Sequence, residues 1–460
     1  MKLGDAGFLL AEKPDRGAQV SMLTRWTLPD GAKEDYVREL VAHWSTCKNF
    51  APPFNLRLKS GLVPDWETLS PDQIDLDYHL RHSALPKPGG ERELGILASR
   101  LHSTPLDRRR PLWEMHVIEG LENNEFAMFF KLHHSQIDGM GSIRLLERVL
   151  SPDPDTRDAP AFWEVPPKTV NKSEGSWLRV PKFSDLNKVA DGAKLAKAFF
   201  DLQTSSDPGN AGAFTSPKTI LNGRLQASRR VATQWFEVAR LSRLAKKVGV
   251  SLNDVVLSIC AGALRNYLEE RGELPKKSLT AGVPVSTRAD ESFGNSISFI
   301  IAKIHTEIAD PVDRLMAIHH STTLAKDRFK NLPSRFTQEA LGSLVMGPYI
   351  GQVALNLAGR ANPVYNVVIS NVPGPREYLY LNGARMEVFY PISMIFDGQA
   401  LNITFLSYAG HYAACFTACR DTVPSMQRIA VGTGEALEEL EAAIDRATSG
   451  EGSNNTSTRK

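Results

Sequence analysis

The chain has 460 residues, which is more than one hydrophobic core usually holds, and we therefore expect two lobes. Its composition, 42% hydrophobic and 23% charged, is ordinary for a soluble globular protein. The formal charge of +2 is nearly balanced, so the overall charge gives no reason to expect a nucleic-acid partner.

Neither a signal peptide nor a membrane span is expected. The start of the chain has no long apolar core, and the nearest candidate span, Leu344–Ala358, is interrupted by a proline and two amides. Four scattered cysteines are too few for a disulfide framework, and Cys415 and Cys419 lack the second ligand pair that zinc needs. These features predict a cytoplasmic protein with free thiols and no metal site.

The first 151 residues alternate between helical and strand-like patterns. Apolar residues recur at helical spacing in some segments, and in others they alternate with polar residues or form short apolar runs. The predicted elements are, in order, a helix through Val37–Trp44, a strand over Asp75–His82, a helix over Arg92–Leu101, strands over Trp113–Ile118 and Phe126–Leu132, and a helix from Ile143 that ends before Pro152.

A change of composition after residue 151 indicates a linker, residues 152–217, in which loose proline-rich stretches flank a helix over Asp185–Leu202. Residues 218–447 form a second predicted lobe, and the polar tail 448–460 is expected to be disordered. The second lobe is predicted to contain helices over Leu241–Val248 and Val256–Tyr267, and strands over Ile297–Ile304, Tyr365–Ser370 and Ala400–Tyr408. The predicted class is α/β (α+β), with a cleft between the lobes.

The run H-H-S-Q-I-D-G, residues His133–Gly139, follows the second predicted strand. If that strand continues into the histidines, His134 shares a face with Leu132, and His133 faces the opposite side. Asp138 and Gly139 are suited to a bend after the strand. Only one of the two histidines is then expected to face a cleft.

The chemistry favoured by this motif is acyl transfer to an alcohol. An alcohol is too weak an acid to attack a thioester unaided, but a neutral imidazole can take its proton and contribute about 10²–10⁴ in rate. The sequence has no G-x-S-x-G nucleophile elbow, no H-E-x-x-H zinc helix and no P-loop. We therefore predict His134 as a general base, without an acyl-enzyme intermediate.

Two adjacent histidines are more often structural than catalytic. His319 and His320, on an apparent helix without a following Asp-Gly, are interpreted in that way. The H-H-x-x-x-D-G spacing distinguishes His133 and His134 from them. Asp138 is expected to support the site through an arginine or backbone amides rather than to touch substrate.

The motif resembles the active-site sequence of the CoA-dependent acyltransferase superfamily, which includes chloramphenicol acetyltransferases and condensation domains. Together with Pro111–Trp113, Asn253–Leu257 and Ser370–Pro375, in that order, it resembles the bacterial wax ester synthase/diacylglycerol acyltransferase family. Trp113 is expected in the core, and Ser370–Pro375 as a loop. One departure is Ala18–Met22, where family members commonly have a Pro-Met-His-Val-Gly-like stretch.

The resemblance implies two chloramphenicol-acetyltransferase-like lobes, each a mixed sheet with flanking helices, joined by a linker and with an active-site tunnel at their interface. It implies fatty acyl-CoA as a donor substrate, no cofactor, and a long-chain alcohol or diacylglycerol as acceptor. In that family the second histidine is the base, which corresponds to His134. The predicted catalytic set is His134, His133, Asp138, Gly139 and Asn253.

Asn253 follows Ser251, which is predicted to cap a helix together with Asp254. At such a helix start, the Asn253 amide and nearby backbone N–H groups can face a developing oxyanion. Two other functions remain open: a CoA-dependent acyltransferase for a small alcohol or amine, and a non-catalytic lipid-droplet protein. Bulky lipid substrates also favour peripheral contact with a membrane or lipid inclusion, for which Leu344–Ala358 is the candidate segment.

Overall fold

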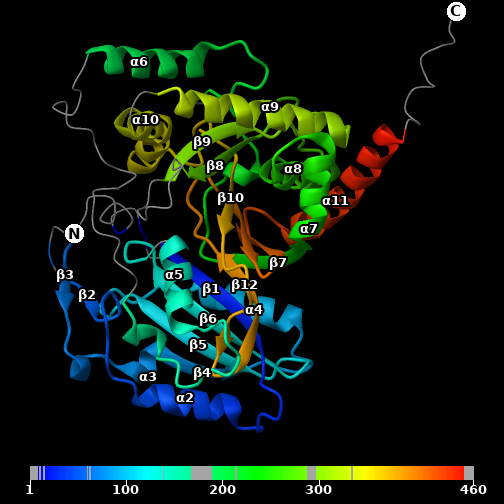
Figure 1. The fold of residues 1–460 in the computed structure, drawn as a ribbon. Helices are drawn as coiled ribbons and strands as arrows, with labels where there is room; N and C mark the ends of the chain where they lie inside the picture. The colour runs from blue at the N-terminus through cyan, green and yellow to red at the C-terminus, as the bar shows by residue number, and fades with distance from the viewer. Residues whose placement is uncertain are drawn as a thin grey trace, which may run out of the picture.

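The computed structural model describes residues 9, 12–13, 16–59, 61, 64–137, 139–166, 189–212, 215–286, 297–332 and 335–449. These residues form two lobes, each built on a six-stranded mixed sheet with helices packed on it (Figure 1). The lower lobe in Figure 1 comes mostly from the N-terminal half of the chain, and the upper lobe mostly from the C-terminal half. The predicted two-lobed architecture is confirmed.

The first sheet has the strand order β11-β12-β1-β6-β5-β4, and β4 and β5 form its one parallel pair among the described strands. Its strands are β1 (Gln19–Thr27), β4 (Leu80–Ala84), β5 (Trp113–Glu119), β6 (Glu125–His133), β11 (Tyr380–Leu381) and β12 (Ala384–Ile392). The helices of this lobe are α2 (Tyr36–Thr46), α3 (Leu76–His79), α4 (Glu91–Ser103) and α5 (Gly139–Val149). A separate two-stranded sheet pairs β2 (Leu56–Leu58) with β3 (Trp66–Thr68).

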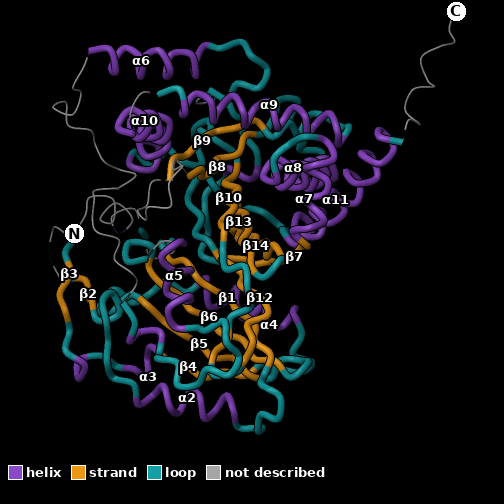
Figure 2. The backbone as a smooth tube through the Cα atoms, viewed as in Figure 1, coloured by secondary structure: helices purple, strands orange, loops and turns teal. Residues whose placement is uncertain are grey.

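The second sheet has the order β7-β14-β13-β10-β8-β9, and β10 runs parallel to both of its neighbours. Its strands are β7 (Arg229–Glu237), β8 (Thr280–Ser286), β9 (Ile297–Lys303), β10 (Val367–Pro373), β13 (Leu401–Tyr408) and β14 (His411–Cys419). The helices of this half are α6 (Val189–Thr204), α7 (Val238–Val248), α8 (Leu252–Glu270), α9 (Pro311–Lys330), α10 (Arg335–Ala354) and α11 (Gln427–Thr448). In Figure 2 the strands run through the middle of the molecule, with α6, α9 and α10 at one end and α2 and α3 at the other.

An apolar core joins the two lobes. It combines Leu23 of β1, Leu97 of α4 and Phe129 of β6 with Val231 of β7 and Cys415 of β14. Helix α4 of the first lobe packs against β7 of the second, so the lobes share a buried interface at this place. This core is separate from the two larger apolar cores, of which the core of the first lobe also includes Leu406 and Tyr408 of β13.

Strand β12 comes from the C-terminal half of the chain but belongs to the first sheet. It pairs with β1 in antiparallel register, from Ser21 opposite Ile392 to Thr27 opposite Arg385. Neither β12 nor β1 was predicted: the apolar residues of β1 do not alternate strictly, and the short alternating run Ala384–Val388 of β12 was overlooked. The boundaries predicted for the four segments of the chain, residues 1–151, 152–217, 218–447 and 448–460, stay a prediction.

The strand predicted over Asp75–His82 is wrong in its first half. The Asp75 side chain accepts a hydrogen bond from the backbone N–H of Tyr78, and this capping bond begins the one-turn helix α3. The strand β4 starts only at Leu80. Part of the predicted linker and most of the polar tail, residues 167–188 and 450–460, lie outside the described residues.

Replacing Met386 by alanine should lower the free energy of unfolding by about 2–5 kcal/mol, because the buried side chain leaves a cavity in the core of the first lobe. Chemical denaturation followed by circular dichroism measures the loss. Met316→Ala is the matched control, since that side chain is 44% exposed on α9. Equal losses in the two variants would contradict the position of β12 inside the first sheet.

Candidate active site

The side chains of β6 alternate between two cores, as predicted. Phe130 and Leu132 pack in the core of the first lobe, whereas Phe129 packs in the core between the lobes. The strand continues into the histidine pair but ends at its first member, His133, and His134 lies in the turn that follows. The backbone N–H of Gln136 donates to the His133 carbonyl at 2.9 Å and closes a turn, which sets the direction of His134.

The two histidines occupy different surroundings. His133 is buried, with 1% of its surface exposed, whereas His134 is half-buried in the turn that follows β6. The backbone N–H of His134 donates to the carbonyl of Ala18 at 3.0 Å, which attaches the turn to the residue just before β1. His134 is therefore the more accessible of the pair.

The hydrogen bonds of His133 define its tautomer. The backbone N–H of Ser135 donates to Nδ1 at 3.2 Å, and the Ser135 hydroxyl lies 2.6 Å from the same nitrogen. A backbone N–H can only donate, so Nδ1 is an acceptor and the proton of the neutral ring is on Nε2. That nitrogen faces a carboxylate oxygen of Glu12, 3.6 Å away.

Glu12 remains ionised beside His133. Burial favours the neutral acid, but contact with His133 and the charge of Arg108 outweigh burial and lower the Glu12 pKa. The Arg108 guanidinium lies 2.8 Å from the carboxylate, and the backbone N–H of Ala18 donates to it at 3.1 Å. Glu12 was not predicted as a site residue, because nothing in the sequence around it indicates that this segment reaches the histidine turn.

A buried ion pair lies on the same face of β6 as His133. Lys131 Nζ is 2.9 Å from Glu114 of β5, and both side chains are almost fully buried. Burial raises the Glu114 pKa, but the neighbouring His116 and the charge of Lys131 outweigh it and lower the pKa to about 2. The Tyr78 hydroxyl donates to the same carboxylate at 3.1 Å. The sequence signal for this pair was the presence of Glu114 and Lys131 inside two strands that were predicted from their apolar residues.

Two further histidines in this lobe are buried and neutral. Burial lowers the pKa of His102 to about 3, and the charges of Arg229 and Lys131 lower it further in the same direction. Burial also lowers the pKa of His79 to about 4, although Nδ1 donates to the Trp113 carbonyl at 2.7 Å. The His79 ring stacks on the Trp113 indole, with 4.3 Å between ring centroids. Trp113 is fully buried, as predicted.

The other predicted site residues are more dispersed. Asp138 lies outside the described residues, and Gly139 begins α5 at an exposed position. Asn253 is half-buried at the start of α8, in the second lobe. The predicted capping of α8 is confirmed: the Ser251 hydroxyl accepts from the backbone N–H of Asp254 at 3.2 Å, and the Asp254 carboxylate accepts from the N–H of Ser251 at 3.0 Å.

The second histidine pair has carboxylate partners. His319 Nδ1 lies 2.8 Å from Asp254, and His320 Nε2 lies 2.8 Å from Asp207. These ion pairs agree with the structural interpretation of this pair. The loop expected over Ser370–Pro375 is wrong in its first part, because residues 370–373 pair with β13 as the end of β10.

No metal site or long apolar span is found in the described part of the chain. There, no three His, Cys, Asp or Glu side chains come together in a group that could hold a metal ion. Within the same residues no single helix is long and apolar enough to cross a membrane; only α7 and α8 taken together, with a bend of 102° between them, meet the criteria of length and composition.

Acidification should destabilise the fold through His79 and His102. Between pH 6.5 and 4.5 the unfolded chain protonates both rings while the folded protein keeps them neutral, so the unfolded state binds more protons and stability falls as the pH falls. Above pH 6.5 this effect is absent. The free energy of unfolding should fall by about 1.4 kcal/mol per pH unit for each ring.

Urea unfolding at a series of pH values measures this slope. His102→Gln should lower the slope by about 1.4 kcal/mol per pH unit, whereas the exposed control His43→Gln should leave it unchanged. An identical slope in His102→Gln and the unmodified protein would show that His102 does not stay neutral in the folded state.

Comparison with known proteins covers nearly the whole chain. Residues 1–256 match the model of the wax ester synthase/diacylglycerol acyltransferase catalytic domain, and residues 293–441 match that of the WS/DGAT C-terminal domain. The O-acyltransferase WSD of Acinetobacter baylyi is 39% identical over 457 residues, which cover 95% of this chain and 96% of the relative.

Solved structures agree with this comparison. The wax ester synthase/diacylglycerol acyltransferase of Marinobacter aquaeolei VT8 superposes with a TM-score of 0.79 at 34% identity, over 96% of this chain and 99% of that one. The starter condensation domain of rhizomide synthetase superposes with a TM-score of 0.56 at 10% identity, over 97% and 94% of the two chains. The second likeness concerns the fold alone.

Proposed function

The chain belongs to the wax ester synthase/diacylglycerol acyltransferase family of acyltransferases, and we propose that it transfers a fatty acyl group from acyl-CoA to a long-chain alcohol or a diacylglycerol. The observation that carries the proposal is the histidine turn. The chain leaves β6 immediately after the buried His133, and His134 stands half-buried on a turn held to the chain before β1.

In the proposed reaction, the His134 imidazole takes the hydroxyl proton of the acceptor as its oxygen attacks the thioester carbonyl. The tetrahedral intermediate then collapses, the carbon–sulfur bond breaks, and the imidazolium returns the proton to the departing thiolate. The products are an ester and free CoA. No acyl-enzyme is formed, so both substrates must be bound at the same time.

The remaining site residues support this step. His133 is a positioning residue, because its ring contacts Ser135 on one side, faces Glu12 on the other and is buried beneath the turn. Asn253, at the N-terminus of α8, is proposed to donate to the oxyanion of the tetrahedral intermediate. Asp138 and Gly139 are proposed to fix the turn that leads from His134 into α5.

His134→Ala should reduce ester formation by at least about 10²-fold, because the general base is lost. His133→Ala should reduce it less, since that variant removes a support of the turn and not the base. Thiol release and ester formation from palmitoyl-CoA and hexadecanol are followed together, with circular dichroism to confirm folding. His320→Ala is the matched control from the second histidine pair, where the side chain is 55% exposed.

Wild-type activity in His134→Ala would refute the assignment of the base. Thiol release without ester would instead indicate a thioesterase. Replacing hexadecanol by a diacylglycerol, a small alcohol or an amine identifies the acceptor class. Ester or amide formed only with the small acceptors would favour the alternative acyltransferase, and no product with any acceptor would favour a non-catalytic lipid-droplet protein.

We also propose that the protein works in contact with a lipid surface, because its acceptors are poorly soluble in water. The predicted segment Leu344–Ala358 is largely α10, which has Leu344 exposed by 42%. Just beyond its end, Leu355 and Leu357 are exposed by 72% and 43%. Exposed apolar side chains gathered in one segment are typical of an interaction surface.

The double variant Leu355→Glu/Leu357→Glu should bind less to liposomes, because two apolar side chains are replaced by anions. Flotation with vesicles that contain phosphatidylglycerol measures the bound fraction. Val431→Glu/Met316→Glu is the control, as these residues are 52% and 44% exposed on other helices. Unchanged flotation of the first variant would remove α10 and its following loop from the proposed surface.

A further inference from the structure

Five cationic residues belong to segments that contact one another where the chain before β1 meets the second lobe, and two of them lie beside a carboxylate. The cations are Lys13, Arg16, Lys218, Arg224 and Arg360, and the carboxylate is Asp397; we call this group the cationic corner. Asp397 accepts from the Arg16 guanidinium and lies 3.8 Å from that of Arg224. Among the described residues, the contacts of this group include one carboxylate, Asp397, so the cations outnumber it.

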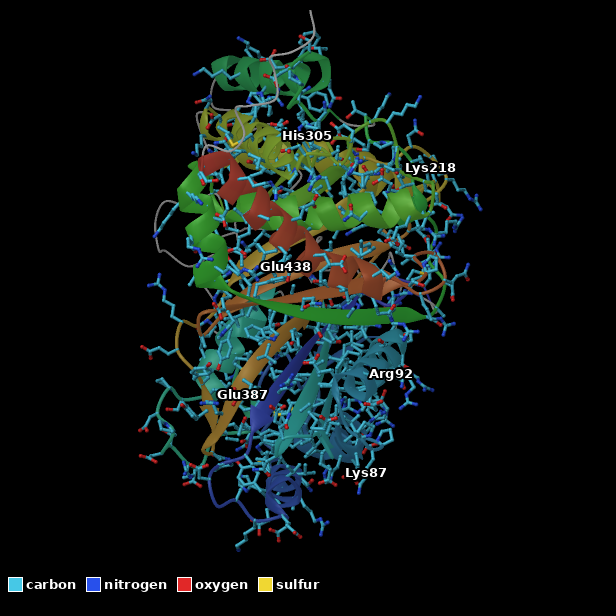
Figure 3. The ribbon with its side chains drawn as sticks, turned by 90° about the vertical axis from the view of Figure 1, so that its right-hand side faces the viewer. Lys87, Arg92, Lys218, His305, Glu387 and Glu438 are labelled. Atoms are coloured by element: carbon cyan, nitrogen blue, oxygen red, sulfur yellow. The ribbon has the colours of Figure 1, made fainter. Side chains whose placement is uncertain are left out.

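Contacts between loops hold the corner together. The Asn356 side-chain oxygen accepts from Arg224 at 2.9 Å and from Lys13 at 3.4 Å, and Lys218 Nζ donates to the Arg360 carbonyl at 2.8 Å. Lys218 and Arg360 are exposed, and Figure 3 shows Lys218 at the edge of the upper lobe. The corner thus combines cations fixed by hydrogen bonds with cations that face solvent.

The backbone beneath the corner is closely packed. Gly398 N–H donates to the Gly223 carbonyl at 3.0 Å, and a Cβ on Gly359 would lie 2.8 Å from the Arg224 side chain. Gly359 and Gly398 both have positive φ, +78° and +80°, which favours glycine at these positions. Asn222 adds three hydrogen bonds from its amide to neighbouring carbonyls. The charges are therefore presented by a preorganised surface rather than by loose side chains.

Two cations of the corner, Lys13 and Arg16, lie close to the histidine turn along the chain. Ala18 accepts the hydrogen bond of the His134 N–H, and two residue steps from Ala18 to Arg16 span at most about 7 Å of backbone. Lys13 is at most about 18 Å of backbone from Ala18. The arm of CoA has about thirteen bonds between sulfur and the first phosphorus, roughly 16 Å at ordinary bond lengths. A thioester beside His134 can therefore place its phosphates at the corner.

We propose that the cationic corner binds the phosphate groups of the CoA portion of the donor. Arginine forks and lysine ammonium groups are the usual partners of phosphate oxygens, and a group in which cations outnumber carboxylates suits the diphosphate and 3′-phosphate of CoA. This inference rests on the proposed function for its ligand. A lipid headgroup offers the same phosphate chemistry, and Leu355 and Leu357 lie in the adjacent segment, so the test separates the two sources.

The test variant is Lys218→Glu/Arg360→Glu, because both side chains are exposed. The matched control is Lys276→Glu/Lys277→Glu, which makes the same change of charge at exposed positions after α8. Initial rates are measured with palmitoyl-CoA and with palmitoyl-pantetheine, which lacks the phosphates. Binding of CoA itself is measured by calorimetry, which does not depend on catalysis.

The test variant should raise KM for palmitoyl-CoA and Kd for CoA by about 10-fold, with little change in kcat. KM for palmitoyl-pantetheine should stay the same, and the control variant should leave all values unchanged. Higher salt should weaken CoA binding by the unmodified protein more than by the test variant.

Unchanged Kd for CoA in the test variant would overturn the proposal. Reduced binding to phosphatidylglycerol vesicles with unchanged KM for palmitoyl-CoA would also overturn it, and would assign the corner to a lipid headgroup. If the unmodified protein forms no ester from either thioester, the proposed function fails; a 10-fold weaker binding of CoA in the test variant would still support the corner as its phosphate site.

Discussion

The antiparallel ladder between β1 and β6 determines where the histidine turn lies. The two strands pair from Gln19 opposite His133 to Thr27 opposite Glu125, and the bond from His134 N–H to the Ala18 carbonyl adds one more link beyond the strand. Because β1 lies between β6 and β12, its position depends on strands from both halves of the chain. The site therefore exists only when the whole chain is folded.

The charged groups at the buried face of β6 each lie beside a group of opposite charge. His133 faces an ionised Glu12, whose charge Arg108 compensates, and Lys131 is paired with Glu114. A buried ion pair contributes little net stability, since desolvation offsets the attraction, but removal of one partner leaves an expensive unpaired charge. These pairs therefore act mainly to fix the alignment of β1, β5 and β6 beneath the turn.

The sequence predicted the features that depend on local pattern. Amphipathic helices, the strands of the β5–β6 hairpin, the capping of α8 by Ser251 and Asp254, and the histidine motif were all found from spacing and residue type. The contacts that come from distant segments were not predicted. Glu12 meets His133, which lies 121 positions later, and Arg16 meets Asp397, which lies 381 positions later. Nothing in the residues around Glu12 or Arg16 indicates these contacts.

Strands were missed where burial hides periodicity. The first half of Asp75–His82 alternates like a strand, yet a side-chain cap at Asp75 turns it into a helix. In β1 both faces are covered, so its alternation is incomplete. Strand β12 alternates over Ala384–Val388, but nothing in that short run indicates that it joins the first sheet. The end of the strand at His133, rather than after His134, depends on one turn hydrogen bond that no residue pattern specifies.

The crossing of β12 into the first sheet restricts how this architecture can be recombined. A chimera that joins the first 151 residues of one relative to the remainder of another would pair β1 of one parent with β12 of the other, and their side chains would meet inside a shared core. Grafting therefore has to carry Tyr380–Ile392 along with the N-terminal lobe. The same constraint applies to natural substitutions. Side chains exchanged in β1 and in β12 have to pack together, although a long stretch of chain separates the two strands.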